Sequence, residues 1–447
     1  MRYRIEKDLL GQRQVPAEAY YGIETLRGKE NFEITKRGIC RQMIKALAIV
    51  KKAAAKANVD ALNIDEKVGK AIMLACDEIL NGRLHGQFVT DLIQGGAGTS
   101  MNMNANEVIA NRANELLGGK KGVYDFVHPN DHVNFGQSTN DVIQTAGKIA
   151  IVKQLKKLQV ELKKLYNAYL NKATEFKDVI KMGRTHLQEA LPLRLGQEFS
   201  AYASALNRDM KRIDVAIEAL LEVNMGATAI GTSLNANEKY RKKVIYYLNK
   251  FSGEQIKPAK DLIDATRNFD TFGQASSTLK LLALNLSKTA SDLRLMASSG
   301  SNGFSEITLP HVQPGSSIMP GKYNPVVPEM VNQVCFYVIG LDVTITKAIE
   351  AGQLELNVFG PIILMSLFEQ ITTLRRATRT FHNLAISGLI ANTTKYKTDN
   401  SIYLITALSP HLGHEEACNV VNEAISSEKT IKQVLFCLLY TSDAADE

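Results

Sequence analysis

The feature that most constrains this chain is a helical repeat of apolar side chains, sustained over long segments. Between residues 155 and 169 apolar residues recur at alternating steps of three and four, and lysines occupy the other helical faces. The apolar positions are Leu155, Leu158, Leu162, Leu165 and Tyr169. Similar segments cover residues 192–223, 261–298 and 325–350, and few of the alternating patterns typical of strands compete with them. The sequence therefore predicts a mostly α fold in which long helices pack as a bundle.

Length and charge are those of a large globular chain. The 447 residues, 45% hydrophobic and 22% charged, allow about two or three domains. Lys and Arg number 53 against 46 Asp and Glu, and this excess is spread along the chain without a basic arm. Such a distribution argues against nucleic-acid binding and is compatible with an anionic substrate.

The N-terminus and the cysteines indicate a cytoplasmic protein. The first residues, MRYRIEKDLL, place charges where a signal peptide needs apolar residues. No uninterrupted apolar segment approaches the roughly 20 residues that cross a bilayer, so we expect no membrane contact. The cysteines lie far apart without CxxC spacing, which argues against a zinc site or a disulfide framework. They are Cys40, Cys76, Cys335, Cys418 and Cys437.

Short polar regions rich in Gly, Ser, Thr and Asn interrupt the helical pattern. They cover residues 94–107 with 134–145, residues 181–197, and residues 300–328. Glycine in such regions lets backbone amides and hydroxyls approach a ligand closely. On composition alone, each region is more often a turn between helices than a binding site.

The final residues, 437–447 (CLLYTSDAADE), depart from the helical pattern before them. They match the translation of a common sequencing-adapter oligonucleotide. We therefore expect residues 437–447 to be an adapter-derived tail outside the fold, and the domain that precedes it to be truncated near Phe436.

The segment GSSIMPGKYNP, at residues 315–325, closely resembles the signature GSSxMPxKxNP of the fumarase/aspartase superfamily. The other polar regions resemble further family regions in the same order, so the resemblance extends from Asp8 to about Phe436. It implies a mostly α, three-domain fold whose central long-helix bundle forms the core of a homotetramer. The expected domains are residues 1–140, a central helical domain at 141–393, and a small C-terminal domain at 394–436.

Several segments resemble aspartases more than class II fumarases. They are GAGTSMNMN (residues 96–104), QSTND (137–141), YYGIETLR, EVNMGATAIGT, NPVVPEMVNQV and EAGQLELNV. One loop, HPND at residues 128–131, is similar to a fumarase accessory-site motif instead. The balance implies an ammonia-lyase that converts L-aspartate to fumarate and ammonia. A class II fumarase and a non-catalytic relative are the alternatives, and the latter would be expected to lack Ser316, Lys322 or His186.

The chemistry explains why such a site needs hydroxyls. The β-hydrogen of aspartate is too weakly acidic for removal unless the neighbouring carboxylate accepts the charge as an enediolate. The site must therefore aim preorganised hydrogen-bond donors at that carboxylate and bind the enediolate more tightly than the substrate. By resemblance, Ser316 is the general base that takes the proton from Cβ, aided by the Lys322 cation and by backbone amides of the glycine-rich turn.

The resemblance also distributes the remaining roles. The β-carboxylate is expected at Thr99, Ser138, Thr139 and Ser317, the α-carboxylate at Thr185, Lys322 and Asn324, and the amino group or α-carboxylate at His186 and Asn140. Met319 completes the expected substrate-binding set, and Ser316, Lys322 and His186 form the expected catalytic set. Taken singly, Thr99 and Ser138 fit helix caps, Lys322 fits a surface lysine, and His186 fits a structural histidine.

The family resemblance further implies that each active site draws its three regions from three subunits, and that the loop carrying Ser316 closes over the substrate. The resemblance also implies that no organic cofactor is needed. No obligatory metal is expected, because the chain has no HExxH motif or carboxylate cluster. The remaining histidines, which we expect to be structural, are His85, His128, His132, His311, His382, His411 and His414.

Some positions depart from the family pattern. Gly136 stands where a larger residue is usual, and Gln144 replaces the proline of NDxxPT. Ser301 and Asn302 replace a Pro-Arg pair, and Tyr323 replaces a small apolar residue beside Lys322. None of them removes an expected catalytic group, but Asn302 and Tyr323 bear on the packing of the loop that carries Ser316.

Overall fold

The computed structural model describes residues 2–299, 303–315, 318–319, 321–392 and 404–443, with side chains described to residue 437 in the last range. The chain divides into two compact units. Unit 1 comprises Met1–Val160, Asp209–Ala283 and Val334–Arg376, and unit 2 comprises Glu161–Arg208, Leu284–Gln333 and Ala377–Glu447. The domain boundaries expected at residues 140, 393 and 436 stay predictions.

Helices dominate the chain, as the apolar periodicity predicts. Unit 1 contains α1 (Ile23–Asn31), α2 (Arg41–Asp60), α3 (Glu66–Leu80), α4 (Thr99–Leu116), α7 (Glu238–Ser252) and α8 (Leu262–Arg267). Unit 2 contains α12 (Ile405–Leu412), α13 (His414–Ser427) and α14 (Ile431–Asp443). The long helices that supply residues to both units are α5 (Thr139–Glu175), α6 (Leu195–Leu220), α9 (Asp270–Met296), α10 (Val326–Glu350) and α11 (Gly360–Phe381).

The strands are short and form pairs. The pairs are β1 (Tyr3–Asp8) with β2 (Gly11–Pro16), β3 (Ile180–Thr185) with β4 (Gln188–Arg194), β5 (Glu222–Val223) with β6 (Lys257–Pro258), and β7 (Ile307–Thr308) with β8 (Ile390–Ala391). All pairs are antiparallel except β5–β6. Short helical turns lie at His85–Gln87, Gly96–Gly98, Pro129–Val133 and His382–Ile386.

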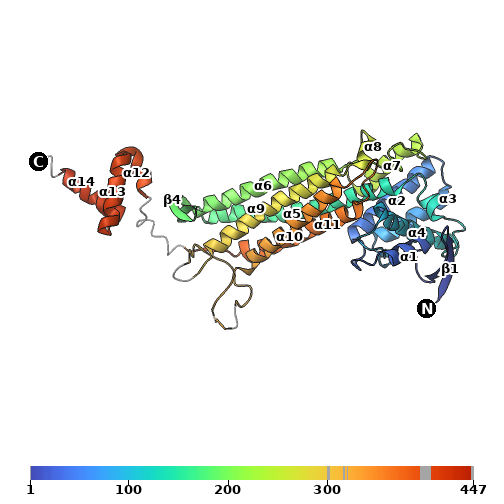
Figure 1. Ribbon diagram of the computed structural model, residues 1–447, viewed down its shortest axis with the longest axis horizontal. Helices are drawn as coiled ribbons and strands as arrows, with labels where there is room; N and C mark the ends of the chain where they lie inside the picture. The colour runs from blue at the N-terminus through green and yellow to red at the C-terminus, as the bar shows by residue number, and fades with distance from the viewer. Residues whose placement is uncertain (1, 300–302, 316–317, 320, 393–403, 444–447) are drawn as a thin grey trace. The chain divides into compact units, whose positions relative to one another are not determined.

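The bundle is held by an apolar seam and by buried polar contacts. Every apolar position of the predicted repeat between Leu155 and Tyr169 is buried in α5. In unit 1, parts of α9, α10 and α11 lie alongside one another (Figure 1). Ser276 of α9 donates to Asp342 of α10 at 2.7 Å, and Gln370 of α11 donates to Ser276 at 3.1 Å. The predicted mostly α bundle is confirmed.

Two of the departures from the family pattern have a structural explanation. Gly136 has a φ of 68°, a left-handed conformation that glycine adopts at little cost. Gln144 lies inside α5, where a proline would remove a helix hydrogen bond. Its buried side-chain amide donates to the Thr266 carbonyl oxygen at 2.7 Å. Gln144 therefore adds a link between α5 and α8.

The C-terminal helices form a small core of their own. It comprises Ile405, Ala417, Val420, Ala424, Ile431 and Val434. Helix α14 runs through Cys437 to Asp443, so the expectation that the helical pattern ends near Phe436 is wrong for the backbone. The physical reason is that Leu435, Leu438 and Leu439 favour a helix. The origin of residues 437–447 stays a prediction.

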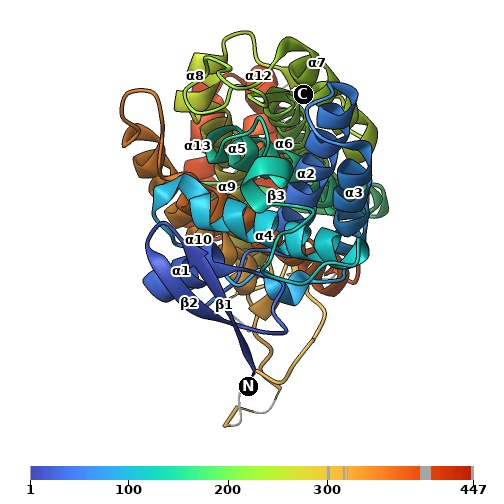
Figure 2. The same cartoon turned by 90° about the vertical axis from the view of Figure 1, so that its right-hand side faces the viewer.

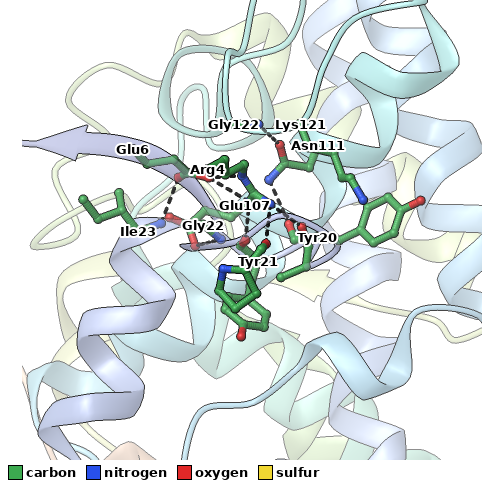
Figure 3. A network of polar contacts seen from close by, with 12 residues as sticks. Arg4, Glu6, Tyr20, Tyr21, Gly22, Ile23, Glu107, Asn111, Lys121 and Gly122 are labelled. Carbon is green, nitrogen blue, oxygen red and sulfur yellow. Dashed lines mark hydrogen bonds and ion pairs between the residues drawn. The ribbon is translucent and has the colours of Figure 1, made fainter. Parts of the chain in front are cut away.

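Two buried carboxylates accept hydrogen bonds from the backbone N–H groups at the start of α1. Figure 3 shows Glu107 of α4 directed at the first turn of this helix. Its oxygens accept the N–H groups of Gly22 at 2.8 Å, Glu24 at 2.9 Å and Thr25 at 3.1 Å. Glu6 accepts the N–H group of Ile23 at 2.9 Å. The first four amides of α1, which lack helical partners, are thus satisfied from outside the helix.

The same carboxylates join the N-terminal hairpin to α4. The hairpin β1–β2 packs against α1, which in turn packs against α4 (Figure 2). Arg4 pairs with Glu6 at 2.7 Å and also donates to the carbonyl oxygens of Ala19 and Tyr21. Burial raises the pKa of Glu107 to about 7, against the opposing effect of its hydrogen-bond donors. The donors therefore offset only part of the cost of burying the negative charge.

A lysine is fully buried in unit 1. Lys51 of α2 is fully buried, and its ammonium group donates to Asn134 Oδ1 at 2.8 Å and to Gln137 Oε1 at 3.0 Å. Burial lowers the pKa of Lys51 to about 7, while the nearby Asp141 opposes the shift. Lys51 thereby holds the loop that leads into α5.

We predict that Glu107→Gln loosens the first turn of α1. The amide has one acceptor oxygen, so its NH₂ group would face a helix N–H group and leave it unpaired. The expected loss is about 1 to 3 kcal/mol of local stability. Hydrogen exchange of the α1 amides measures it. The control is Glu115→Gln, which removes a half-exposed carboxylate from Arg112 and Tyr20. Equal exchange in both variants would contradict the capping role of Glu107.

We predict that Lys51 makes stability depend on pH above neutrality. Above pH 7 the folded protein has lost this proton, whereas the unfolded lysine keeps it until about pH 10. Unfolding then takes up a proton, so the free energy of unfolding rises with pH by at most about 1.4 kcal/mol per pH unit. Urea unfolding between pH 7 and 9 measures the slope, which Lys51→Met should reduce. Lys52→Met, a change at the neighbouring position, should keep it; a wild-type slope in Lys51→Met contradicts the prediction.

Candidate active site

The first expected substrate-binding residue begins helix α4. Thr99 follows a glycine-rich turn in which Ala97 and Gly98 have φ values of 57° and 93°. A side chain at Gly98 would meet Ile143 of α5 at 3.2 Å, so this glycine lets the two helices approach. The exposed Thr99 hydroxyl donates to the Gly96 carbonyl oxygen at 2.7 Å. Thr99 thus stands at a helix start whose free N–H groups favour an anion.

The next group begins helix α5. The Ser138 hydroxyl accepts the Asn140 N–H at 3.2 Å, as a helix cap does. The Thr139 hydroxyl accepts a hydrogen bond from Asn102 of α4 at 3.4 Å, and Asn140 donates to the Ala229 carbonyl oxygen at 2.6 Å. Unit 1 therefore brings the segments GAGTSMNMN and QSTND together.

Sequence reasoning missed the residues that support this group. Asp141 is buried and accepts the N–H groups of Ser138 at 2.9 Å, Gly226 at 3.1 Å and Thr228 at 3.1 Å. Burial raises the pKa of Asp141 to about 6, against these donors. Asn102 was missed as well. The segment EVNMGATAIGT, which contains Gly226 and Thr228, does resemble aspartases. That resemblance gave no role to any single residue in it.

A strained turn presents two further expected residues in unit 2. Strands β3 and β4 pair Thr185 with Gln188, so a two-residue turn of His186 and Leu187 joins them. Both turn residues have positive φ values, 54° and 63°, in a region that L side chains rarely adopt. The right-handed twist of hairpins favours this turn, but glycine or asparagine usually occupies it. Thr185 and His186 are both exposed.

The signature segment also lies in unit 2, but Ser316 and Ser317 fall outside the described residues, as do Ser301 and Asn302. A side chain at Gly315 would meet the Lys322 carbonyl oxygen at 1.9 Å, so only glycine fits this close return of the chain. Asn324 donates to the Gly315 carbonyl oxygen at 3.2 Å, and the Lys322 N–H donates to the Met319 carbonyl oxygen at 3.2 Å. The exposed Lys322 and Met319 thus stand within one folded-back segment.

Tyr323 has a partner. Its ring stacks on the His311 imidazole with centroids 3.6 Å apart and planes 6° from parallel. The two rings, with Asn324, contribute to the lining of a cavity of about 350 Å³. The substitution expected to disturb this loop is therefore accommodated by packing within the same segment.

Two other expectations concern metals and the HPND loop. Among the described residues, no group of three or more His, Cys, Asp or Glu side chains could hold a metal ion. His128 uses its Nδ1 atom locally, accepting the N–H groups of Asn130 at 3.3 Å and Asp131 at 3.2 Å. The HPND loop is therefore a capped turn in unit 1.

Comparisons with known proteins agree on the family. A family model described as lyase matches residues 11–340. Aspartate ammonia-lyase from Bacillus subtilis is 52% identical over 434 residues, covering 97% of this chain and 91% of that protein. Among solved structures, fumarate lyase:delta crystallin from Brucella melitensis bound to cobalt is 45% identical with a TM-score of 0.95, covering 98% of this chain and 96% of that one.

A solved class II fumarase from Schistosoma mansoni has the same TM-score of 0.95 at only 35% identity, covering 98% of this chain and 95% of that one. The fold is thus common to both branches, while sequence identity is higher on the aspartase side. The resemblance seen in the signature segment is confirmed. The chain belongs to this lyase family, the fumarase/aspartase superfamily, and within it to the aspartases.

Proposed function

We propose that this chain catalyses the reversible elimination of ammonia from L-aspartate to give fumarate. The observation that carries the proposal is the 52% identity to an aspartate ammonia-lyase over 97% of the chain. Every residue of the expected catalytic set, Ser316, Lys322 and His186, is also present in the sequence. A relative that had kept only the fold would not be expected to retain all three.

The geometry of unit 1 supports a cradle for the β-carboxylate. Thr99 and the pair Ser138 and Thr139 stand at the starts of α4 and α5, and Asn102 links the two helices there. Hydroxyls and helix N–H groups are donors for a carboxylate, and they gain strength as the enediolate develops its second negative oxygen. We assign these residues, with Ser317, to the β-carboxylate. The Thr99 hydroxyl would exchange its bond to Gly96 for one to substrate.

The remaining roles complete the reaction. Ser316, as its alkoxide, takes the proton from Cβ and becomes a hydroxyl, which leaves the substrate as the enediolate. The enediolate then collapses to the C=C bond of fumarate, and the C–N bond breaks with its electron pair leaving on ammonia. Thr185, Lys322 and Asn324 hold the α-carboxylate, with Lys322 as its cationic partner. We assign His186 and Asn140 to the amino group or α-carboxylate, and Met319 to substrate binding. Because hydrogen bonds disperse the charge, the reaction needs no organic cofactor.

We further propose that the chain works as a cytoplasmic homotetramer in which three subunits build each site. Helix α10 supports an assembly, since it is apolar on more than one face. Its length and composition would also allow it to cross a membrane. Only 39% of its most apolar stretch is buried within the chain, so most of that stretch is available to another subunit. Phe336, Tyr337 and Val343 are exposed on it. An apolar helix of this kind is expected in the core of a larger bundle.

The direct test is fumarate formation, followed by its ultraviolet absorbance, from L-aspartate and separately from L-malate. We expect turnover of aspartate only, and loss of that turnover in Ser316→Ala by a factor on the order of 10³ or more. Ser427→Ala, on an exposed part of α13, should keep the wild-type rate. Turnover of malate alone would identify a fumarase instead. Full aspartate activity in Ser316→Ala would refute the assignment of the base.

A mixing experiment tests the shared site. We predict that His186→Asn and Ser316→Ala are each inactive alone but regain activity after they are dissociated and reassembled together. If the two residues of one site come from different subunits, about a quarter of randomly assembled sites carry both native residues. Activity near that fraction of wild type is the expected result. Reassembled mixtures that stay inactive would show that one subunit supplies both residues.

A further inference from the structure

A buried ionic cluster lies behind the Thr185–His186 turn in unit 2. We define the Glu306 cluster as Glu306, Lys181, Arg184 and Glu198. The Glu306 side chain is fully buried, and Arg184 donates to its Oε1 atom. The Lys181 ammonium lies 2.6 Å from Glu306 Oε2 as an ion pair, outside the angles of a hydrogen bond. Lys181 also donates to both carboxylate oxygens of Glu198, at 3.0 and 3.1 Å.

The main chain holds Glu306 firmly. Its N–H donates to the Met296 carbonyl oxygen at the end of α9 at 2.8 Å, and its carbonyl oxygen accepts the Asn392 N–H at 3.0 Å. The next residues form β7, which pairs with β8. The backbone of Glu306 is therefore held by segments that are remote from β3 in sequence. Its carboxylate binds the two cations of β3.

The cluster acts on a hairpin that backbone pairing alone restrains weakly. The register of β3 and β4 shifts between Met182 and Arg184, so an irregularity separates the tip from the rest of the ladder. Beyond it only two residue pairs, Arg184 with Glu189 and Thr185 with Gln188, hold the tip. Strained residues such as those of this turn persist only where their surroundings over-determine them. Arg184 supplies such a restraint next to Thr185.

The Arg184 side chain has little freedom to do anything else. Its guanidinium group lies 4.3 Å from the centroid of the Phe304 ring, two residues before Glu306. An arginine that bonds a buried carboxylate and also lies over an aromatic face has both its plane and its direction fixed. The backbone position of the following residue, Thr185, is set in turn.

We propose that Glu306 is a positioning residue for catalysis: by binding Lys181 and Arg184 it sets the place of Thr185 and His186 in the active site. The inference rests on the proposed function for the roles of those two residues, and it names a group outside the expected substrate-binding set. Glu306 does not touch the substrate. It determines how accurately the hairpin presents the groups that do.

The test is Glu306→Gln, which keeps the shape of the side chain and removes its charge. We expect hydrogen exchange at residues 184–188 to speed up at least about tenfold while α2 stays protected. We also expect kcat/KM for L-aspartate, per folded protein, to fall on the order of 100-fold, since a displacement of about 1 Å has that effect. If the single variant does not fold, Lys181→Gln combined with Glu306→Gln is measured instead, because it returns the net charge of the Glu306 cluster to zero, with Arg184 and Glu198 as the remaining charges.

The matched control is Asp342→Asn. Asp342 is also a buried carboxylate bound by a lysine, with Lys280 at 2.6 Å, but it lies in unit 1. It should lower thermal stability without changing the hairpin or kcat/KM. A Glu306 variant with unchanged hairpin exchange, or with the kcat/KM of the control, overturns the proposal. Wild-type protein that does not convert aspartate refutes the proposed function, whereas the hairpin exchange still tests the restraint.

Discussion

Buried ionisable groups hold segments of this chain in place, including those that carry the expected site residues, and the rest of the structure depends on them. Glu107 binds the start of α1, Lys51 binds the loop before α5, and Asp141 binds the loop after β5. A charge removed from water is tolerated only when several partners surround it. Each of these groups therefore links segments that are remote in sequence, and none of them needs to touch a substrate.

This anchoring suits the chemistry proposed for the chain. An enediolate gathers charge on one carboxylate, and donors stabilise that charge most when they need not reorganise as it forms. Thr99 and Ser138 begin helices whose positions Asn102 and Asp141 fix. A flexible loop of the same composition could reach the same carboxylate, but it would spend binding energy on becoming ordered.

The helices could be predicted from the sequence because their signal is local. The repeat from Leu155 to Tyr169 needs only its own spacing, and the structure buries all of it. The continuation of α14 beyond Phe436 was missed because helix propensity outweighed the change in pattern there. The His186–Leu187 turn was missed for a different reason. Neither residue is a usual turn former at positive φ, so pairing between β3 and β4 imposes a geometry that local sequence does not indicate.

The candidate site also contains residues that local sequence identifies and residues that it does not. Its hydroxyls, lysine and histidine could be named from motifs, because the reacting groups lie in short recognisable segments. Asp141 and Glu306 could not, since their partners are brought to them only by folding. The effect of a departure from the family pattern also depends on partners that folding brings near. Tyr323 replaces a small residue but stacks on His311, so a change that looks disruptive along the sequence is matched by a neighbour in space.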